Sequence, residues 1–234
     1  MTNSAPLAGI KVLDVSSVLS GPLTTMLLAA LGADVVKVEP PSAPDFTRGT
    51  GAAHNGMTAY FYNTNRGKKA IVVDGRHPVG QKILQQLADQ ADVVVQNMRP
   101  GKVAGIGLDP HECMKRNESL IYASISGYGS DGPMANDPVY DYVIQAVTGM
   151  VDAQRDPTTD AIDLTRHFPA DKITAHATVE AILAALFARE RHPQRQGQHV
   201  EVSMHEANLA FMWVCLLYTS DAADDTPCVD LGGR

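Results

Sequence analysis

The stretch HFPADKITAH (167–176) places a single acid, Asp171, ahead of the long apolar run ATVEAILAALFARE. Aspartate is a preferred residue at the start of a helix, where its side chain accepts a backbone N–H. A carboxylate can also attack an activated carbonyl and form a covalent intermediate. From this stretch alone helix capping is the favoured interpretation, and nucleophilic attack is the alternative.

Basic residues gather in two glycine-containing loops, NTNRGKKA (63–70) and NMRPGK (97–102). Guanidinium groups there can bind phosphate oxygens through paired hydrogen bonds. Solvated surface charge is the competing and slightly favoured interpretation. The side chains that would converge on phosphates are those of Arg66, Lys68, Lys69, Arg76, Arg99 and Lys102.

Other chemical motifs are missing from the sequence. The apolar segment 10–18 is not followed by GxGxxG, so we do not expect a bound NAD or FAD. Ser17 and Ser20 do not lie in a GxSxG turn, and hydrogen bonding within a loop is their expected role. The eight histidines form no HExxH pattern, and we predict no metal site.

The elements that must position these residues alternate between strand-like and helix-like segments. We expect strands at 10–18, 33–39, 68–74, 92–97 and 119–127, with helices at 23–31, 80–91 and 109–116 between them. Gly32 is expected to end the first helix. Because the strands are apolar on both faces, the pattern predicts an α/β fold with an open, buried parallel sheet. Functional loops then lie at the carboxyl ends of the strands.

The second half of the chain no longer shows the regular alternation of strand-like and helix-like segments. Residues 127–138 are rich in Gly, Pro, Asp and Asn and indicate a loop, and 139–151 resemble a helix. A polar excursion precedes a long helix over 171–191. A strand at 199–204 and the beginning of another helix follow.

Composition bounds the class of protein. The chain has 234 residues, 44% hydrophobic and 19% charged, which is typical of one large or two small globular domains. It has no apolar run long enough to span a membrane and no secretory leader, so a cytoplasmic location is expected. The net charge of −7 and the lack of a basic stripe argue against nucleic acid as a partner.

Residues 215–234, CLLYTSDAADDTPCVDLGGR, break the preceding helical pattern. The string CLLYTSDAAD matches, codon for codon, the translation of a sequencing-library transposon adapter. We therefore interpret 215–234 as a translated adapter and expect the natural sequence to stop near Val214. Cys113 would then be the sole natural cysteine, which predicts neither a disulfide framework nor a thiolate metal site.

An ordered set of blocks between Leu7 and Val214 resembles the class III CoA-transferase family, which includes formyl-CoA transferase, carnitine CoA-transferase and α-methylacyl-CoA racemase. The blocks are LAGIKVLDVSSVLSGP, LGADVVKVEPP, NTNRGKKAIVVD, ADVVVQNMRPG, LIYASISGYGSDGP, VYDYVIQAVTG, PADKITA and RQGQHVEVSM. The resemblance implies that residues 1–214 form an incomplete large domain with a Rossmann-like sheet and helices on both faces, followed by the start of a smaller domain. It also implies an interlocked homodimer when the chain is full length.

The resemblance further implies the activity and its residues. CoA would move between an acyl-CoA and a small carboxylic acid, with Asp171 as the nucleophile that becomes an aspartyl anhydride and then an aspartyl-CoA thioester. Coenzyme A would be the cofactor, without a metal or a redox nucleotide. The positions that match the family's CoA-contacting blocks are Leu19, Ser20, Pro40, Val73, Asp74, Gly75, Arg76, Asn97, Met98, Arg99, Lys102, Pro138, Val139, Tyr140 and Asp141.

Three departures from the family pattern refine this expectation. Leu19 and Pro40 stand where formyl-CoA transferase carries Gln and Arg, which argues against formyl or oxalate specificity. Tyr140 stands where the racemases carry the histidine of their His-Asp pair, which favours transfer over racemisation. A racemase-type isomerase and an inactive truncated CoA-binding fragment are the alternatives. The helix dipole at Asp171 is expected to keep this carboxylate ionised and to lower its basicity.

Overall fold

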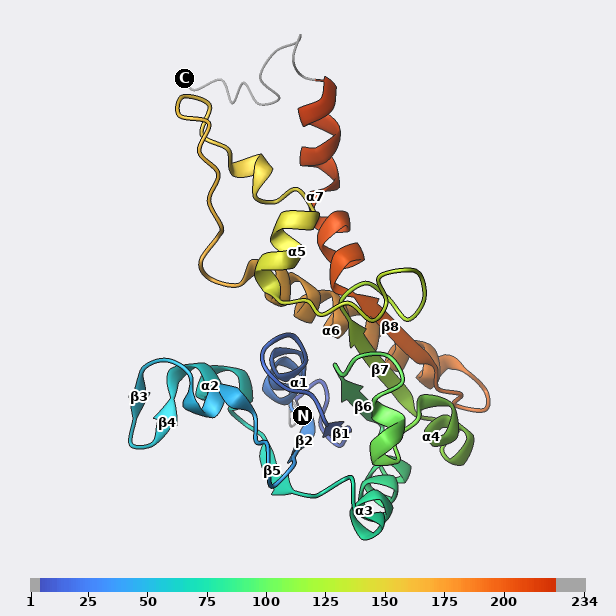
Figure 1. The fold of residues 1–234 in the computed structure, drawn as a ribbon. Coiled ribbons are helices and arrows are strands. Elements are labelled where there is room, and N and C mark those ends of the chain that lie inside the picture. The colour runs from blue at the N-terminus through green and yellow to red at the C-terminus, as the bar shows by residue number, and fades with distance from the viewer. Residues whose placement is uncertain (1–4, 222–234) are drawn as a thin grey trace.

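The computed structural model describes residues 5–221 and contains a six-stranded, fully parallel sheet in the order β5-β2-β1-β6-β7-β8 (Figure 1). This sheet confirms the α/β fold that the strand-helix alternation predicts. The strands are β1 (Lys11–Asp14), β2 (Asp34–Glu39), β5 (Lys69–Val72), β6 (Val93–Gln96), β7 (Ile121–Ser126) and β8 (His199–Ser203).

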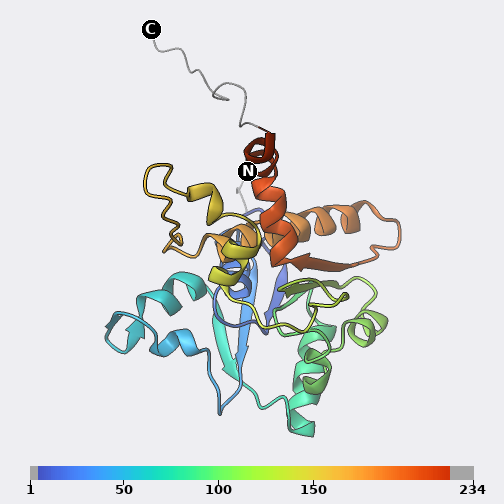
Figure 2. The ribbon, with the colours of Figure 1, turned by 45° about the horizontal axis from the view of Figure 1, so that its top comes forward.

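Helices cover both faces of the sheet. They are α1 (Ser20–Ala30), α2 (Ala59–Asn65), α3 (Pro78–Asp89), α4 (Pro110–Arg116), α5 (Asp141–Val147), α6 (Pro169–Arg191) and α7 (Met204–Asp221). Shorter elements are η1 (Phe46–Gly49), β3 (Ala53–His54), β4 (Met57–Thr58), η2 (Val103–Ile106) and η3 (Asp152–Gln154). Figure 2 shows that α7 projects from the body of the molecule, and that β3, β4 and α2 lie at the side away from β8.

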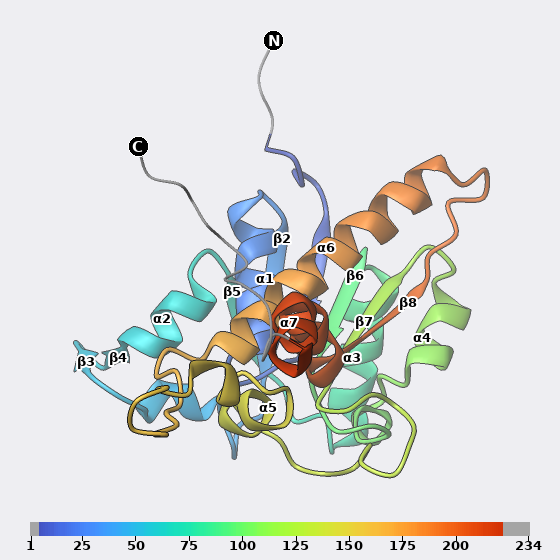
Figure 3. The same ribbon diagram turned by 90° about the horizontal axis from the view of Figure 1, so that it is seen from above.

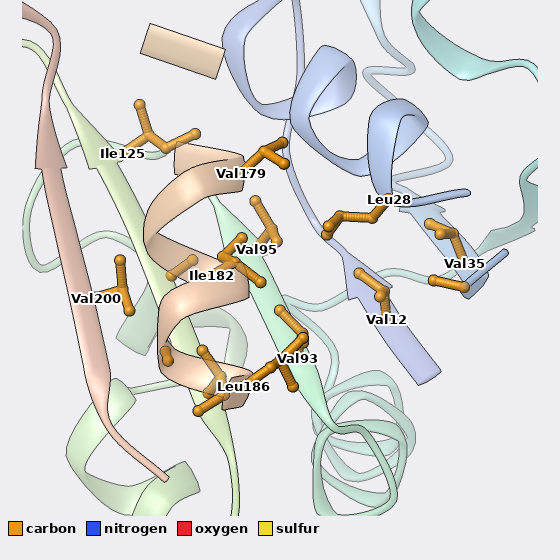
Figure 4. Close-up of a cluster of buried hydrophobic side chains, with 14 of the residues drawn as sticks. Val12, Leu28, Val35, Val93, Val95, Ile125, Val179, Ile182, Leu186 and Val200 are labelled. Atoms are coloured by element: carbon orange, nitrogen blue, oxygen red, sulfur yellow. The ribbon is translucent and has the colours of Figure 1, made fainter. Parts of the chain in front are cut away.

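The sheet is buried on both faces because successive residues of each central strand are apolar and point to opposite faces. Val12 and Val93 are paired neighbours that pack against α1 and α6, together with Leu28 and Ile182 (Figure 4). The next residues along each strand face the opposite layer, where α3 and α4 cover them. Figure 3 shows α1 and α6 side by side over the first face. Burial on both faces is typical of parallel sheets, whose crossover helices lie on each side.

The end of α1 illustrates how local sequence sets an element's limit. Gly32 has φ +101°, a left-handed conformation that glycine adopts without a steric penalty. The Gly32 N–H donates to the Ala29 carbonyl at 2.9 Å and the Ala33 N–H to the Leu28 carbonyl at 3.1 Å, the pairing of a Schellman motif. The predicted glycine stop is therefore confirmed.

The last helix differs from the sequence-based expectation. We expected the helical pattern to break after Val214, but α7 continues to Asp221 because the residues that follow are compatible with a helix. The remainder of the predicted adapter tail, 222–234, lies outside the described residues. In the part of the chain that the structure describes, no helix has the length and apolar character needed to cross a membrane.

Candidate active site

The site lies where the strand order of the sheet reverses. From β1 the chain runs through β2 to β5 on one side, whereas β6, β7 and β8 lie on the other. The loops after β1 and β6 therefore diverge and leave a crevice at the carboxyl edge, the usual ligand position in open α/β sheets. Here they border a cavity of about 190 Å³, which we call the reaction cavity, lined among others by Ser20, Arg99 and Asp171.

Asp171 is the third residue of α6 rather than its N-cap. Phe168 occupies the cap position in a left-handed conformation, φ +55°, and makes no side-chain capping bond. The Asp171 carboxylate instead reaches α1, where its Oδ1 accepts the Ser20 N–H at 3.2 Å. Capping is supplied from α5, because Asp141 Oδ2 accepts the Asp171 N–H at 2.9 Å. The helix-capping interpretation of Asp171 is thus wrong, since its side chain accepts a hydrogen bond from α1 and lines the cavity.

The pKa of Asp171 is raised, although its place near the start of a helix would by itself lower it. Burial leaves Asp171 only 8% exposed and, with the neighbouring Asp141 carboxylate, raises the pKa of Asp171 to about 6. The hydrogen bond from Ser20 acts in the opposite direction and does not offset them. The expected lowering of basicity is therefore wrong in sign. A carboxylate with a raised pKa stays mostly ionised at neutral pH and is a better nucleophile than an ordinary aspartate.

Aromatic side chains from three elements gather beside Asp171. The Phe168 ring lies 5.9 Å from the Tyr60 ring on α2 and 5.6 Å from the Tyr142 ring on α5, measured between centroids. Burial, followed by the Asp171 charge, raises the pKa of Tyr60, so its hydroxyl stays protonated. The sequence analysis missed Tyr60 and Phe168, because nothing in either local segment signals a contact across more than a hundred residues.

A second cavity adjoins the first. Its volume is about 290 Å³, and its lining is mostly apolar, including Pro40, Val73 and Gly75. The two cavities share Ser17 and Met98, so they meet at the loops after β1 and β6. A ligand with an extended arm can therefore occupy both.

Most of the predicted CoA-contacting residues lie at these two cavities. The reaction cavity is lined by Ser20, Asn97, Met98, Arg99, Pro138, Val139 and Tyr140, and the second by Pro40, Val73, Gly75 and Met98. Asp74 and Arg76 flank Gly75, and Arg76 Nη2 donates to the Ser42 hydroxyl at 2.7 Å. Leu19 is buried and lines neither cavity, and Lys102 is exposed before η2.

Convergence of the basic side chains on phosphates, the less favoured of the two interpretations, is wrong for two lysines. Lys68 Nζ is buried against Asp14 Oδ2 at 2.9 Å, and Lys69 Nζ pairs with Asp34 at 2.7 Å. Lys68 reaches across β2 to a carboxylate of β1, and Lys69 pairs with a carboxylate of β2, the strand next to its own. Local sequence does not reveal either contact. Arg99 is the member of the predicted set that lines the reaction cavity.

Metal binding has no candidate among the side chains that the structure describes, those of residues 5–213. No group of three or more His, Cys, Asp or Glu side chains there is placed to hold an ion.

The fold and site define an α/β protein with a buried carboxylate in a cavity at the switch point of its sheet. An acetyl-CoA:oxalate CoA-transferase of Acetobacter aceti is 36% identical over 212 residues, 91% of this chain and 54% of that protein. A succinyl-CoA:glutarate CoA-transferase of Homo sapiens is 36% identical over 215 residues, 90% of this chain and 48% of that protein. The crystal structure of a CAIB/BAIF family protein from Brucella suis matches with a TM-score of 0.87 at 33% identity, covering 96% of this chain and 60% of that one.

The chain belongs to CoA-transferase family III, whose family model matches residues 7–228. The resemblance drawn from the sequence blocks is confirmed. The chain spans about half the length of the curated relatives described above. The adapter origin of 215–234 stays a prediction, and resequencing the locus by a ligation-free method tests it.

Proposed function

We propose that the protein to which this chain belongs is a CoA-transferase that moves CoA from an acyl-CoA to a carboxylic acid, with Asp171 as the nucleophile. The observation that carries this proposal is the Asp171 carboxylate, buried in the reaction cavity and held by the Ser20 N–H. Members of the family with 36% identity are named for such transfers. We further expect a homodimer at full length and a cytoplasmic location.

The proposed chemistry begins with two acyl exchanges at Asp171. An Asp171 oxygen attacks the thioester carbonyl, the C–S bond breaks, and CoA leaves as a thiolate while an acyl-aspartyl anhydride forms. The thiolate then attacks the aspartyl carbonyl of this anhydride, and the donor acid leaves as its carboxylate. The product is an aspartyl-CoA thioester on Asp171.

The acceptor reverses the sequence. Its carboxylate attacks the aspartyl thioester carbonyl, CoA leaves again as a thiolate, and a second anhydride forms. Attack of the thiolate on the acceptor's carbonyl releases the new acyl-CoA and regenerates the Asp171 carboxylate. Because each intermediate is a thioester or an anhydride, one carbonyl stays activated at every stage and no ATP is consumed.

Ser20 is proposed to act where charge develops. When the aspartyl carbonyl becomes tetrahedral, the negative charge builds on an Asp171 oxygen, and the Ser20 N–H already lies 3.2 Å from Oδ1. A donor fixed before the reaction stabilises this charge without reorganisation.

CoA is proposed to span both cavities. Its nucleotide end would occupy the apolar second cavity beside Pro40, Val73 and Gly75, and its sulfur end would reach the reaction cavity past Met98. Arg99 is the cation placed to pair with a CoA phosphate or a substrate carboxylate. Holding the thiolate close to Asp171 keeps each step effectively intramolecular.

Mass spectrometry tests the proposal on the protein expressed from the complete open reading frame. Incubation with an acyl-CoA, followed by hydroxylamine, should convert Asp171 to a hydroxamate that is absent from Asp171→Asn. Asp163→Asn, an exposed carboxylate in the segment leading to α6, is the matched control and should leave labelling unchanged. Transfer activity that survives in Asp171→Asn would refute the assignment.

A further inference from the structure

The segment that joins β1 to the first residue of α1, which we call the 16–20 loop, is held mainly by hydrogen bonds with side chains. Its carbonyls at Ser16 and Ser17 accept from Lys37 Nζ and Asn97 Nδ2, both at 2.8 Å. The backbone N–H groups of Ser16, Ser17, Val18 and Ser20 donate to the side chains of Asp14, Asn97, Asp45 and Asp171, respectively. The shape of this 16–20 loop therefore depends on partners elsewhere in the fold.

Val18 gives the loop an unfavourable turn. Its φ is +72°, and a β-branched residue is a conformational outlier in this left-handed region. Such a backbone persists only where its surroundings enforce it, and it is concentrated at functional sites. The Val18 N–H is fixed on Asp45 Oδ2 at 3.2 Å, and two residues later the Ser20 N–H reaches Asp171 Oδ1.

The enforcing group is a buried ion pair. Lys37 Nζ lies 3.3 Å from Asp45 Oδ2, and the two side chains are 0% and 1% exposed. Lys37 thus contacts the loop directly at the Ser16 carbonyl and indirectly through Asp45 at the Val18 N–H. The Thr47 backbone N–H and hydroxyl both donate to Asp45 Oδ1, which fixes its orientation. A buried pair seldom adds stability over apolar residues of the same size, so this one needs another explanation.

We propose that the Lys37–Asp45 ion pair positions Asp171 by holding Val18 in its left-handed turn, which aims the Ser20 N–H at the Asp171 carboxylate. Lys37 acts through the loop alone, whereas Asp45 also lines the second cavity. The effect of the pair on Asp171 passes through the backbone of Val18 and Ser20. The catalytic consequence rests on the proposed role of Asp171, whereas the positioning itself can be measured without any substrate.

The test is an NMR titration of the 234-residue chain. In the parent, the Asp171 side-chain carbon and the Ser20 amide should titrate together with a midpoint of about 6. The double variant Lys37→Met/Asp45→Asn removes both charges, so neither the net charge nor an unpaired buried ion complicates the comparison. Asp141 and Tyr60, which face Asp171 from α5 and α2, are unchanged.

In the double variant, the Ser20 amide should no longer follow Asp171. The Asp171 midpoint should rise by about one pH unit, because the carboxylate loses a hydrogen bond that favours its charged form. Adding Val18→Gly should restore much of the coupling, since glycine adopts the left-handed turn without needing an anchor. If the ion pair only stabilised the fold, Val18→Gly would not restore the coupling between the Ser20 amide and Asp171.

The matched control is a second ion pair, Arg189–Asp92, at 3.0 Å with side chains 1% and 27% exposed. It joins the last turn of α6 to the residue before β6, at the opposite edge of the sheet from Asp171. Arg189→Met/Asp92→Asn should lower the melting temperature and leave the Asp171 midpoint unchanged. An unchanged midpoint and an unchanged Ser20 coupling in Lys37→Met/Asp45→Asn would overturn the proposal.

If that variant does not fold, amide hydrogen exchange in the parent decides the question. Val18 and Ser20 should exchange together, and a slow Val18 with a fast Ser20 would overturn the proposal. If Ser20 and Asp171 titrate together but no hydroxamate forms on Asp171, the positioning proposal stands and the proposed transfer function is refuted.

Discussion

The Asp171 carboxylate is both buried and open to a cavity, two properties that seldom occur together. It is buried enough to be basic, yet it lines a cavity into which a substrate can enter. The neighbouring Asp141 has two effects. Its charge raises the pKa of Asp171, and its Oδ2 accepts the Asp171 N–H and so caps α6. A buried carboxylate with a raised pKa is expected to lower the stability of the folded chain at neutral pH.

The stability of Asp171→Asn should reveal that cost. A carboxyl group whose pKa rises from 3.8 to about 6 on folding binds more protons in the folded chain. Its contribution to stability is therefore fully present below pH 3.8 and is lost as the pH rises through 6. Asp171→Asn, which cannot ionise, should be more stable than the parent at pH 7.5, by up to about 3 kcal/mol.

Urea unfolding at pH 7.5 and at pH 3.5 measures this difference. The gain should vanish at the lower pH, where both proteins carry a neutral side chain at position 171. The exposed Asp163→Asn should show no such dependence. A gain of the same size at both pH values would contradict a titration origin.

Arg99 and Lys102 provide a comparison between two cations of the same predicted loop. Arg99 lines the reaction cavity, and Lys102 is exposed outside it. Arg99→Met should weaken CoA binding by about 10- to 100-fold, the effect of losing a charge-assisted hydrogen bond. Isothermal titration calorimetry should show a much smaller change for Lys102→Met, and equal losses would contradict the placement of CoA.

At the residue scale, Asp171 was predicted as the nucleophile from the ordered blocks around it rather than from its own neighbours. Locally, the cap interpretation was favoured, and the structure shows capping by Asp141 instead. A signal for the loop anchors was present, however. Lys37 interrupts the apolar strand VVKVE, and a lysine inside a strand expected to be buried calls for a charged partner.

At the scale of elements, strand prediction succeeded because β-branched runs bounded by Gly and Pro carry a local signal. The expected strands at 10–18 and 92–97 correspond to β1 and β6. The short elements η1, β3, β4 and α2 were not predicted, since a few residues cannot display a helical or strand period. Strand order was also beyond local sequence, because pairing joins residues far apart in the chain.

The junction of the 16–20 loop with α1 depends on a glycine. A Cβ at Gly21 would lie 2.3 Å from Ser16 Cβ, which is shorter than any tolerated contact. Gly21→Ala should therefore displace the loop, lower stability by about 1–3 kcal/mol and slow hydroxamate formation on Asp171. Gly105→Ala, whose added Cβ would meet nothing within 4 Å, is the control, and equal effects on labelling would contradict the argument.

At the scale of the whole molecule, the described chain holds both cavities although it spans about half of its relatives' length. It should therefore bind CoA without the rest of the protein. CoA at ten times its Kd should add about 1.4 kcal/mol of stability and raise the melting temperature by about 3–6 °C.

Differential scanning calorimetry of the 234-residue chain checks this shift. NAD⁺ at the same concentration is the control and should have no effect, because the chain lacks the glycine-rich dinucleotide turn. A cooperative transition that CoA does not move would show that binding needs the remaining half.

The distribution of the site along the chain has a consequence for biosynthesis. The second cavity is complete once residues 15–106 have been made, but the Ser20–Asp171 hydrogen bond joins residues 151 positions apart. On a ribosome that adds about 5–20 residues per second, α6 is made several seconds after the residues that line the second cavity. A nascent chain therefore completes the cavity proposed for CoA before it completes the proposed nucleophile's surroundings.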